Sequence, residues 1–157
     1  MRTTLWLGRV FTFVLGAGTM MSCAPSPPPF KPVADVKQLM QSVIDPAADV
    51  LWEATGTIIT AEGTEERAPK TEAEWNAVQT HAMMLTESGN LLMMVPRAKD
   101  GGAWMTRSQE LVDTGVAALR AAEAKNVGQL FTAGGAIYEA CVNCHEQYVD
   151  AITGAVP

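Results

Sequence analysis

The segment Cys141-Val142-Asn143-Cys144-His145, near the C-terminal end of the 157-residue chain, constrains the fold more than any other feature. C-x-x-C-H is the attachment sequence for a c-type haem. On a helical turn, two thiols three residues apart lie on one face, where each can form a thioether bond to a haem vinyl group. The next imidazole is then held under the porphyrin, and a proximal His is a standard axial ligand of haem iron. The motif predicts one haem c per chain on Cys141 and Cys144, with His145 as the proximal iron ligand.

Three other interpretations of the cysteine pair have less support. A structural zinc site usually needs four Cys or His ligands, but the chain contains three Cys and two His, and Cys23 has another expected role. A thioredoxin-like C-x-x-C would lie near a βαβ pattern, and no part of the sequence has one. A disulfide between Cys141 and Cys144 would close a very short loop with strained geometry. Haem attachment is the favoured interpretation.

The N-terminus predicts export from the cytoplasm. Arg2 and Arg9 flank a first apolar stretch, and an apolar run continues from Val10 to Ala17. This pattern of a positive region and a short apolar region is typical of a signal peptide, and it is too short for a mature membrane span. A buried N-terminal helix is the alternative. Export agrees with the haem motif, since bacteria attach haem covalently outside the cytoplasmic membrane.

The end of the signal peptide determines how the mature chain meets the membrane. Met20-Met21-Ser22-Cys23 resembles a bacterial lipobox, although Leu is more usual where Met20 stands. We therefore predict a lipoprotein-type signal peptide over 1–22, lipid modification of Cys23, a Pro-rich semi-rigid tether over 23–32 and a cytochrome domain over 33–157. Ordinary signal-peptide cleavage, leaving a free periplasmic protein, is the alternative. The expected location is the periplasm, with the lipid anchor as the only membrane contact.

The charge of the chain narrows the choice of partners. The whole chain has a formal net charge of −6, and removal of residues 1–23 takes away two Arg and no acid, leaving −8. Nucleic acid and anionic lipid headgroups are therefore poor direct partners. A redox partner with a basic docking face is the expected kind of partner.

Apolar spacings of three and four residues predict a first helix from Val36 to about Ile58. Asp45-Pro46 interrupts it, because Pro suits only the first turn of a helix. We expect a kink there, or a break and a restart at Asp45. Residues 61–70 are acidic, end in Ala-Pro-Lys, and are expected to form a loop.

Three further helices are expected after this loop. A capping box at Thr71–Glu74 begins the second helix, which ends before Pro96. The third helix covers about 103–125, and Asn126 caps the fourth. The fourth helix has an apolar face made of Leu130, Phe131, Gly134, Ile137, Tyr138, Cys141, Cys144, His145 and Tyr148.

This pattern predicts an all-α fold. No segment shows the alternation of a half-buried strand. Four helices with short connections favour an antiparallel four-helix bundle, a fold that holds cofactors between facing helices. The haem would be covalently bound on the C-terminal helix.

At this point the chain resembles a known family, the class II cytochromes c, which include the cytochromes c-prime and their low-spin relatives. The resemblance covers about residues 33–150 and rests on the exported N-terminus, four helices, and C-x-x-C-H in the last helix followed by Tyr148. Family members often carry a basic residue shortly after the motif, where this chain has Glu146, Gln147, Val149 and Asp150.

The resemblance implies that the first helix crosses the distal haem face. Met40 is the candidate distal ligand, and His/Met ligation of haem iron raises the reduction potential. His81 is a second candidate for the distal ligand. The alternative for Met40 is that its side chain only packs in the hydrophobic core. If Leu39 or Val36 faces the iron, the haem is five-coordinate and binds nitric oxide or carbon monoxide, as the cytochromes c-prime do.

The predicted function is electron transfer, without enzymatic activity. The alternative is a gas-binding haem protein, and a haem subunit tethered to a membrane complex is a third class. The family also implies a possible homodimer that pairs through its early helices. Weaker expectations concern haem propionates, for which the candidate partners are Arg97, Lys99, Arg107 and Arg120. The aromatic side chains that could pack on the porphyrin are Trp52, Phe131, Tyr138 and Tyr148. Gly134-Gly135 predicts either a close approach of the α-helical backbone to haem or a neighbouring helix, or a local break in the helix.

Overall fold

The structure, a computed structural model, describes residues 30–153 of the chain. The predicted signal peptide, the predicted lipid attachment at Cys23 and most of the predicted tether lie outside the described residues. The described part is mostly helical, which confirms the broad prediction of a helical protein. It also contains a small two-stranded sheet that was not predicted. None of its helices combines the length and the apolar character needed to cross a membrane.

The first helical segment is continuous but changes its geometry in the middle. It comprises α1 (Val36–Leu39), a π-helical turn η1 (Met40–Ile44) and α2 (Asp45–Glu53). The Asp45 N–H donates to the carbonyl of Met40, five residues earlier. This wide turn directly precedes Pro46, whose ring would collide with the carbonyl of residue 42 in a regular helix. The predicted disturbance at Asp45 is therefore a π-helical turn rather than a break.

The chain after α2 forms a β-hairpin, which corrects the prediction of helix to Ile58 and loop over 61–70. Strand β1 (Gly56–Thr60) pairs with the antiparallel strand β2 (Gly63–Arg67), with Thr60 opposite Gly63. Four consecutive β-branched residues, 57–60, favour an extended backbone over a helix. Gly56 and Gly63 have φ values of +156° and +146°, which residues with side chains rarely adopt. Both strands therefore begin at a position that favours glycine.

The other three helices begin close to where their capping signals predict. In α3 (Glu72–Met93), Glu74 N donates to Thr71 Oγ1 over 3.2 Å and Thr71 N donates to Glu74 Oε2 over 2.8 Å, which confirms the capping box. Helix α4 covers Ala103–Glu123, and α5 covers Val127–Thr153. Gln129 N donates to Asn126 Oδ1 over 3.0 Å, which confirms Asn126 as the cap of α5.

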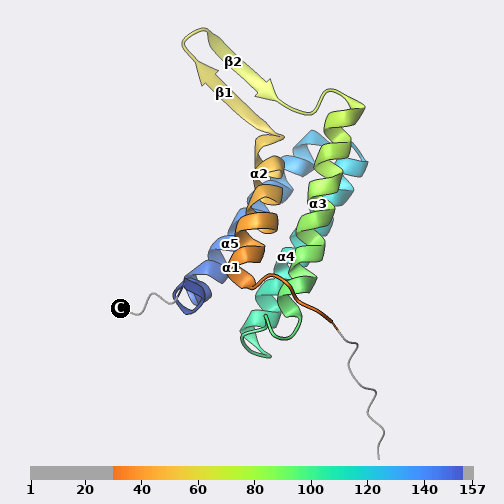
Figure 1. Ribbon diagram of the computed structural model, residues 1–157. Coiled ribbons are helices and arrows are strands. Elements are labelled where there is room, and N and C mark those ends of the chain that lie inside the picture. The colour runs from red at the N-terminus through yellow and green to blue at the C-terminus, as the bar shows by residue number, and fades with distance from the viewer. Residues whose placement is uncertain (1–29, 154–157) are drawn as a thin grey trace, which may run out of the picture. The chain divides into compact units, whose positions relative to one another are not determined.

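The helices pack in sequence, and the first segment also contacts the last (Figure 1). Helix α3 lies along α4, α4 lies along α5, and α2 packs against both α3 and α5. The α3–α4 contact is close because glycines lie in it. A Cβ on Gly89 would lie 2.6 Å from Val112 Cγ2, and one on Gly115 would lie 2.5 Å from Thr86 Oγ1. These positions exclude any side chain, so the backbones of α3 and α4 can approach each other.

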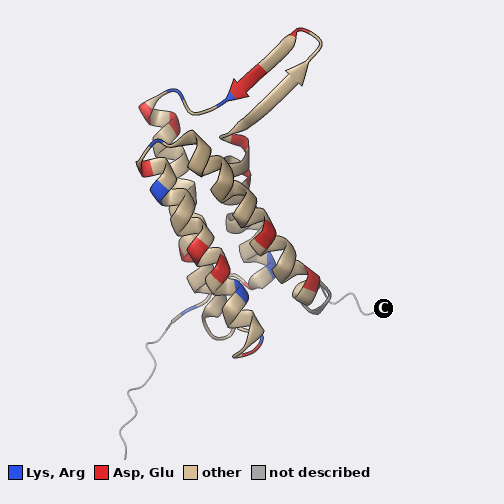
Figure 2. Ribbon diagram, turned by 180° about the vertical axis from the view of Figure 1, so that it is seen from behind, with Lys and Arg blue, Asp and Glu red and all other residues tan. Residues whose placement is uncertain are grey.

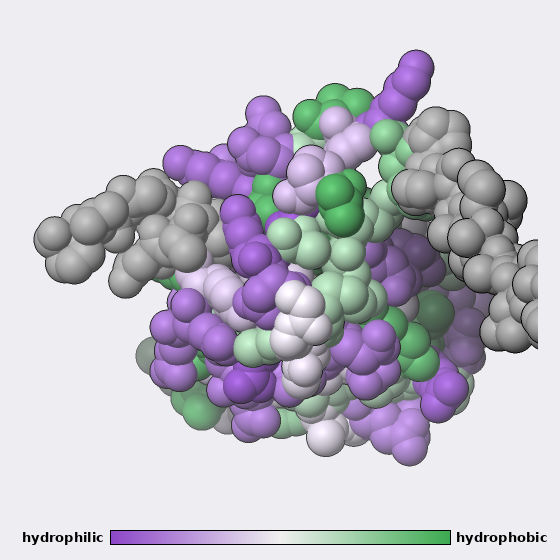
Figure 3. Space-filling model, turned by 90° about the horizontal axis from the view of Figure 1, so that it is seen from below, coloured by the Kyte–Doolittle hydropathy of each residue, from purple (hydrophilic) through white to green (hydrophobic). Residues whose placement is uncertain are grey.

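The predicted apolar face of α5 is the side of the helix that packs on the others, but two of its residues are exposed. Phe131 and Tyr138 are 63% and 60% exposed, whereas Tyr148 is buried. Gly134 is buried in the contact with α2, where Trp52 Nε1 donates to its carbonyl over 2.9 Å. A Cβ on Gly134 would lie 3.5 Å from Trp52 Cδ1, an ordinary contact distance, so this contact does not require a glycine. Helix α5 has no break there. On the face seen from below, hydrophilic residues surround a narrow strip of moderately hydrophobic ones (Figure 3).

Candidate cofactor site

The cysteine motif and Met40 line the same narrow cavity, whose walls come from the first helical segment and from α3, α4 and α5. Cys141, Cys144 and His145 come from α5, and Met40 comes from η1. The cavity has a volume of about 20 Å³, roughly the room that one water molecule needs. Its remaining lining residues are Ile44, Asp45, Leu92, Arg107, Ser108, Leu111 and Ala140. The structure therefore brings together the predicted proximal motif and the predicted distal residue from opposite ends of the domain.

Helix α5 presents the motif because it runs through it without interruption. Residues three and four apart lie on one side of a helix, so Cys141, Cys144 and His145 face the same cavity. Cys144 is buried, and Cys141 and His145 are half-buried. Both thiols are free within the described part of the chain.

The surroundings of the two thiols keep them protonated. Burial, followed by the neighbouring Cys144 and then Asp45, raises the pKa of Cys141 to about 11. Burial also raises the pKa of Cys144, although Arg107 acts in the opposite direction. A redox-active dithiol needs a lowered thiol pKa. This environment therefore argues against a thioredoxin-like role for the pair.

The π-helical turn is the feature of the distal wall that sequence reasoning missed. Met40 begins this turn and is half-buried, and Met40, Ile44 and Asp45 all line the cavity. Single π-helical turns are rare and occur frequently at functional sites. Pro46 was the sequence signal for a disturbance here, but it did not specify the wider turn.

Arg107 is the one Arg or Lys among the residues that line the cavity. Its Nη1 donates to both carboxylate oxygens of Glu110, over 2.9 and 2.8 Å. Hydrogen bonding to Glu110, and then its charge, raise the pKa of Arg107. The guanidinium is therefore charged and held in place at the edge of the cavity.

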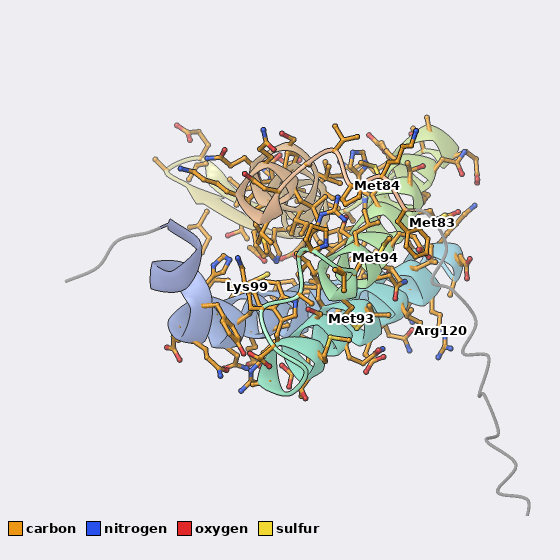
Figure 4. The ribbon with its side chains drawn as sticks, turned by 60° about the horizontal axis from the view of Figure 1, so that its bottom comes forward. Met83, Met84, Met93, Met94, Lys99 and Arg120 are labelled. Carbon is orange, nitrogen blue, oxygen red and sulfur yellow. The ribbon has the colours of Figure 1, made fainter. Side chains whose placement is uncertain are left out.

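The other three basic candidates do not line the cavity. Arg97 is buried and donates to the carbonyls of Ala34 and Leu91, over 3.0 and 3.3 Å. Lys99 lies on the loop before α4, and Arg120 lies near the far end of α4; both are exposed (Figure 4). Of the four residues proposed as propionate partners, the structure brings Arg107 alone to the cavity.

The alternative distal residues also lie elsewhere. His81 is on α3, with Nδ1 2.7 Å from the carbonyl oxygen of Ala77, and it does not line the cavity. Val36 and Leu39 are buried in the core and are not among the lining residues. The apolar side chain on the distal wall is instead Ile44.

Tyr148, three residues beyond His145, fastens α5 to the start of α4. Its hydroxyl donates to Asp100 Oδ2 over 2.5 Å. Its ring packs edge-to-face with Trp104, and the two ring centroids are 5.0 Å apart. Asp100 Oδ1 also accepts from the backbone N–H of Gly102 and of Trp104, over 2.8 and 3.1 Å. The Asp100 hydrogen bond raises the pKa of Tyr148 to about 12, and the same bond lowers the pKa of Asp100.

Sequence reasoning named Tyr148 but missed its partner. An Asp just before a helix is a favoured capping residue, so the position of Asp100 before α4 was a usable signal. No cluster of three or more His, Cys, Asp or Glu side chains suited to a metal ion occurs in the described range 30–153.

Comparison with known proteins gives no match, so the assignment of a function depends on the residues described above. No protein-family model, no curated protein and no solved structure matches this chain.

Proposed function

We propose that this chain is an electron-transfer c-type cytochrome. One haem would be attached to Cys141 and Cys144, with His145 as the proximal ligand and Met40 as the distal ligand. The observation that supports this proposal is the shared cavity, because all four side chains line it although Met40 belongs to the other end of the domain. C-x-x-C-H alone predicts haem attachment; the position of Met40 adds a second axial donor.

The chemistry of the cavity fits a haem. Ile44, Leu92 and Leu111 provide apolar walls for a macrocycle, and Arg107 provides a cation for a carboxylate at its edge. The cavity volume of about 20 Å³ is far below the ~300–1,000 Å³ typical of small-molecule pockets. The walls must therefore move apart when haem is attached.

We infer that the helices form an antiparallel four-helix bundle, with the haem between its first and last members. The packing of α2 against both α3 and α5, together with the α3–α4 and α4–α5 contacts, supports this arrangement. Bundles hold cofactors between facing helices, and the cavity lies between such helices.

Bound haem would supply a reversible one-electron change at its iron. The protein would hold His145 and Met40 in position on its helices, and a His/Met pair raises the reduction potential. The apolar walls would keep water away from the site. We also propose export to the periplasm and lipid modification of Cys23, which the N-terminal sequence supports.

The test is an optical spectrum of the reduced holoprotein with and without carbon monoxide. Sharp low-spin bands that carbon monoxide leaves unchanged are expected. Ile44 on the distal wall favours the alternative, a five-coordinate gas-binding protein, if Met40 does not bind the iron. A broad high-spin spectrum that shifts with carbon monoxide would establish that alternative. Absence of covalent haem after expression in a host with haem-attachment machinery would refute both.

A further inference from the structure

The β-hairpin stands away from the helices and contributes little to their core (Figure 1). Nine of its ten strand residues are exposed, and Gly56 is half-buried. At its base, Arg67 Nη1 donates to the carbonyl of Glu53 over 3.2 Å, and farther along β2 Glu65 Oε1 lies 3.9 Å from Lys70 Nζ, between two exposed side chains. A hairpin of two strands is marginally stable in water without further packing. Its exposure therefore calls for a partner.

Each strand of the hairpin has one edge without a neighbouring strand in the described part of the chain. Such edges are templates for pairing, and proteins usually protect them with Lys, Pro or a bulge. Strand β1, with the sequence Gly-Thr-Ile-Ile-Thr, contains neither Lys nor Pro, and its register with β2 is regular. Its edge is unprotected.

The two edges differ in charge. Strand β1 has no charged residue, whereas Glu62 lies in the turn and Glu65, Glu66 and Arg67 lie on β2. Figure 2 shows the acidic side of the hairpin on β2. A basic partner would be attracted to the β2 edge. The β1 edge suits a strand without charge.

We propose that the free edge of β1 binds the same edge of a second copy of this chain, which creates a four-stranded antiparallel sheet in the order β2–β1–β1–β2. The uncharged edge is compatible with itself. The acidic strands would be the outer ones, separated by three strand spacings of about 14 Å. This exceeds the Debye length of about 8 Å at physiological salt, so their repulsion is largely screened.

The symmetry of such a pair defines a register. Two antiparallel copies of one strand are related by a two-fold axis perpendicular to the sheet, so residues opposite each other share a face. An axis at Ile58 places Ile58 opposite its own copy and Thr57 opposite Ile59 of the second copy. Ile58, 37% exposed in the single chain, would gain an aliphatic neighbour, and Ile59, 79% exposed, would lie opposite the β-branched Thr57. Cross-strand pairs of this kind stabilise sheets.

The proposed surface differs from the early-helix pairing that the family resemblance implies, and it does not depend on haem. Strands of five residues bury less area than the ~1,600 Å² of a standard interface. The dimer is therefore expected to be weak, with a dissociation constant of about 0.1 mM. It would be largely monomeric at ~1 µM and substantially dimeric at several hundred µM.

Sedimentation equilibrium of the mature protein, from ~1 to ~500 µM, tests the proposal. Two variants are compared, at exposed positions that lie opposite each other on β1 and β2. Ile59→Lys puts a charge on the β1 edge close to the two-fold axis and should weaken the dimer at least ~10-fold. Thr64→Lys changes the residue opposite Ile59 on β2 and should leave the dimer within ~2-fold of wild type. Far-UV circular dichroism of both variants checks that the helices remain folded.

Disulfide trapping tests the register. Opposed residues in a non-hydrogen-bonded antiparallel pair have Cα atoms about 4.5 Å apart, within the range of disulfides. Ile58→Cys should give a dimer that reductant dissolves, and Thr64→Cys should not, although both variants keep the native cysteines. Four outcomes would each overturn the proposal. The protein could stay monomeric at all concentrations, or grow into larger open assemblies. The two cysteine variants could cross-link equally, or Ile58→Cys could trap a different protein.

Discussion

At the scale of single residues, Met40 would decide between the two haem functions proposed above. Its side chain lines the cavity from the π-helical turn and faces the motif on α5. A thioether that binds iron leaves no open position for a gas, whereas an apolar distal wall leaves one.

Met40→Ala should convert a low-spin spectrum that is insensitive to carbon monoxide into a high-spin spectrum that responds to it. The reason is the loss of the sixth ligand, with Ile44 remaining as the apolar neighbour. Optical titration of the reduced variant with carbon monoxide measures the change. Met83→Ala, at a 53% exposed position on α3 (Figure 4), is the matched control and should behave like wild type. An unchanged Met40→Ala spectrum would remove Met40 from the site.

Under the proposed function, Arg107→Gln should lower the reduction potential of the haem by roughly a few tens of mV. A cation near the iron disfavours its more positive oxidised state, so removal of the cation stabilises that state. Potentiometric titration of the holoprotein provides the measurement. Arg120→Gln, at an exposed position of α4 away from the cavity, is the control. Equal potentials for both variants would show that Arg107 does not face the haem.

The elements are joined at two places whose effect on stability can be measured. One is the close α3–α4 contact at Gly89, and the other is the Tyr148–Asp100 hydrogen bond between α5 and the start of α4.

Gly89→Ala should destabilise the protein by about 1–3 kcal/mol, the usual range for overpacking. The added Cβ would lie 2.6 Å from Val112 Cγ2 and 2.9 Å from the carbonyl oxygen of Ser108, and a backbone atom cannot easily move aside. Gly135→Ala on α5 meets no atom within 4 Å and should stabilise by roughly 0.5–1 kcal/mol through helix propensity. Urea denaturation of the two variants compares them. Similar stabilities would contradict the close packing of α3 and α4.

The Tyr148–Asp100 hydrogen bond should make stability depend on pH at both extremes. The pKa of Tyr148 is raised to about 12, so its contribution is complete below the unfolded value of about 10 and is lost as pH rises towards 12. The pKa of Asp100 is lowered, so its contribution is present above about 4 and is lost as pH falls through its folded value. Thermal melts at several pH values measure the loss of stability at both the alkaline and the acidic extreme.

Tyr148→Phe provides the control for this pH dependence. It keeps the ring against Trp104 but removes the hydroxyl, so the Tm should fall by a few degrees at neutral pH. The alkaline loss of stability between pH 10 and 12 should become smaller. An alkaline limb identical to that of wild type would show that another group causes it.

The charge of the whole molecule should govern its encounter with redox partners. Without the predicted signal peptide and Cys23, the chain would have a formal net charge of −8, and opposite charges accelerate association most at low salt. Electron transfer to a basic redox protein should therefore slow steeply as ionic strength rises. Stopped-flow kinetics with one basic and one acidic probe protein measures this, and the acidic probe should show the opposite trend. Identical salt dependence for both probes would exclude electrostatic docking.

Sequence alone was sufficient where the controlling interactions are local. The caps at Thr71 and Asn126 depend on residues within a few positions of one another. The basis of the haem prediction is equally local, because C-x-x-C-H specifies its thiols and imidazole within five residues, but haem attachment stays a prediction. The prediction of helix up to Ile58 was wrong. The spacing of Ile58 from the preceding apolar residues fits a helix, but Gly56 and the neighbouring β-branched residues form a strand.

Tertiary structure decided every feature that depends on which helix lies opposite. Arg107 lines the cavity and Arg120 does not, although both lie on α4, because they are several turns apart. Phe131 and Tyr138 share the apolar pattern of α5 but are exposed, because α2 covers Gly134 between them and leaves them at the margin. Met40 and His145 share one cavity only because the first and last helical segments pack together. Local patterns determine the helices and the motif, whereas long-range packing determines which side chains meet.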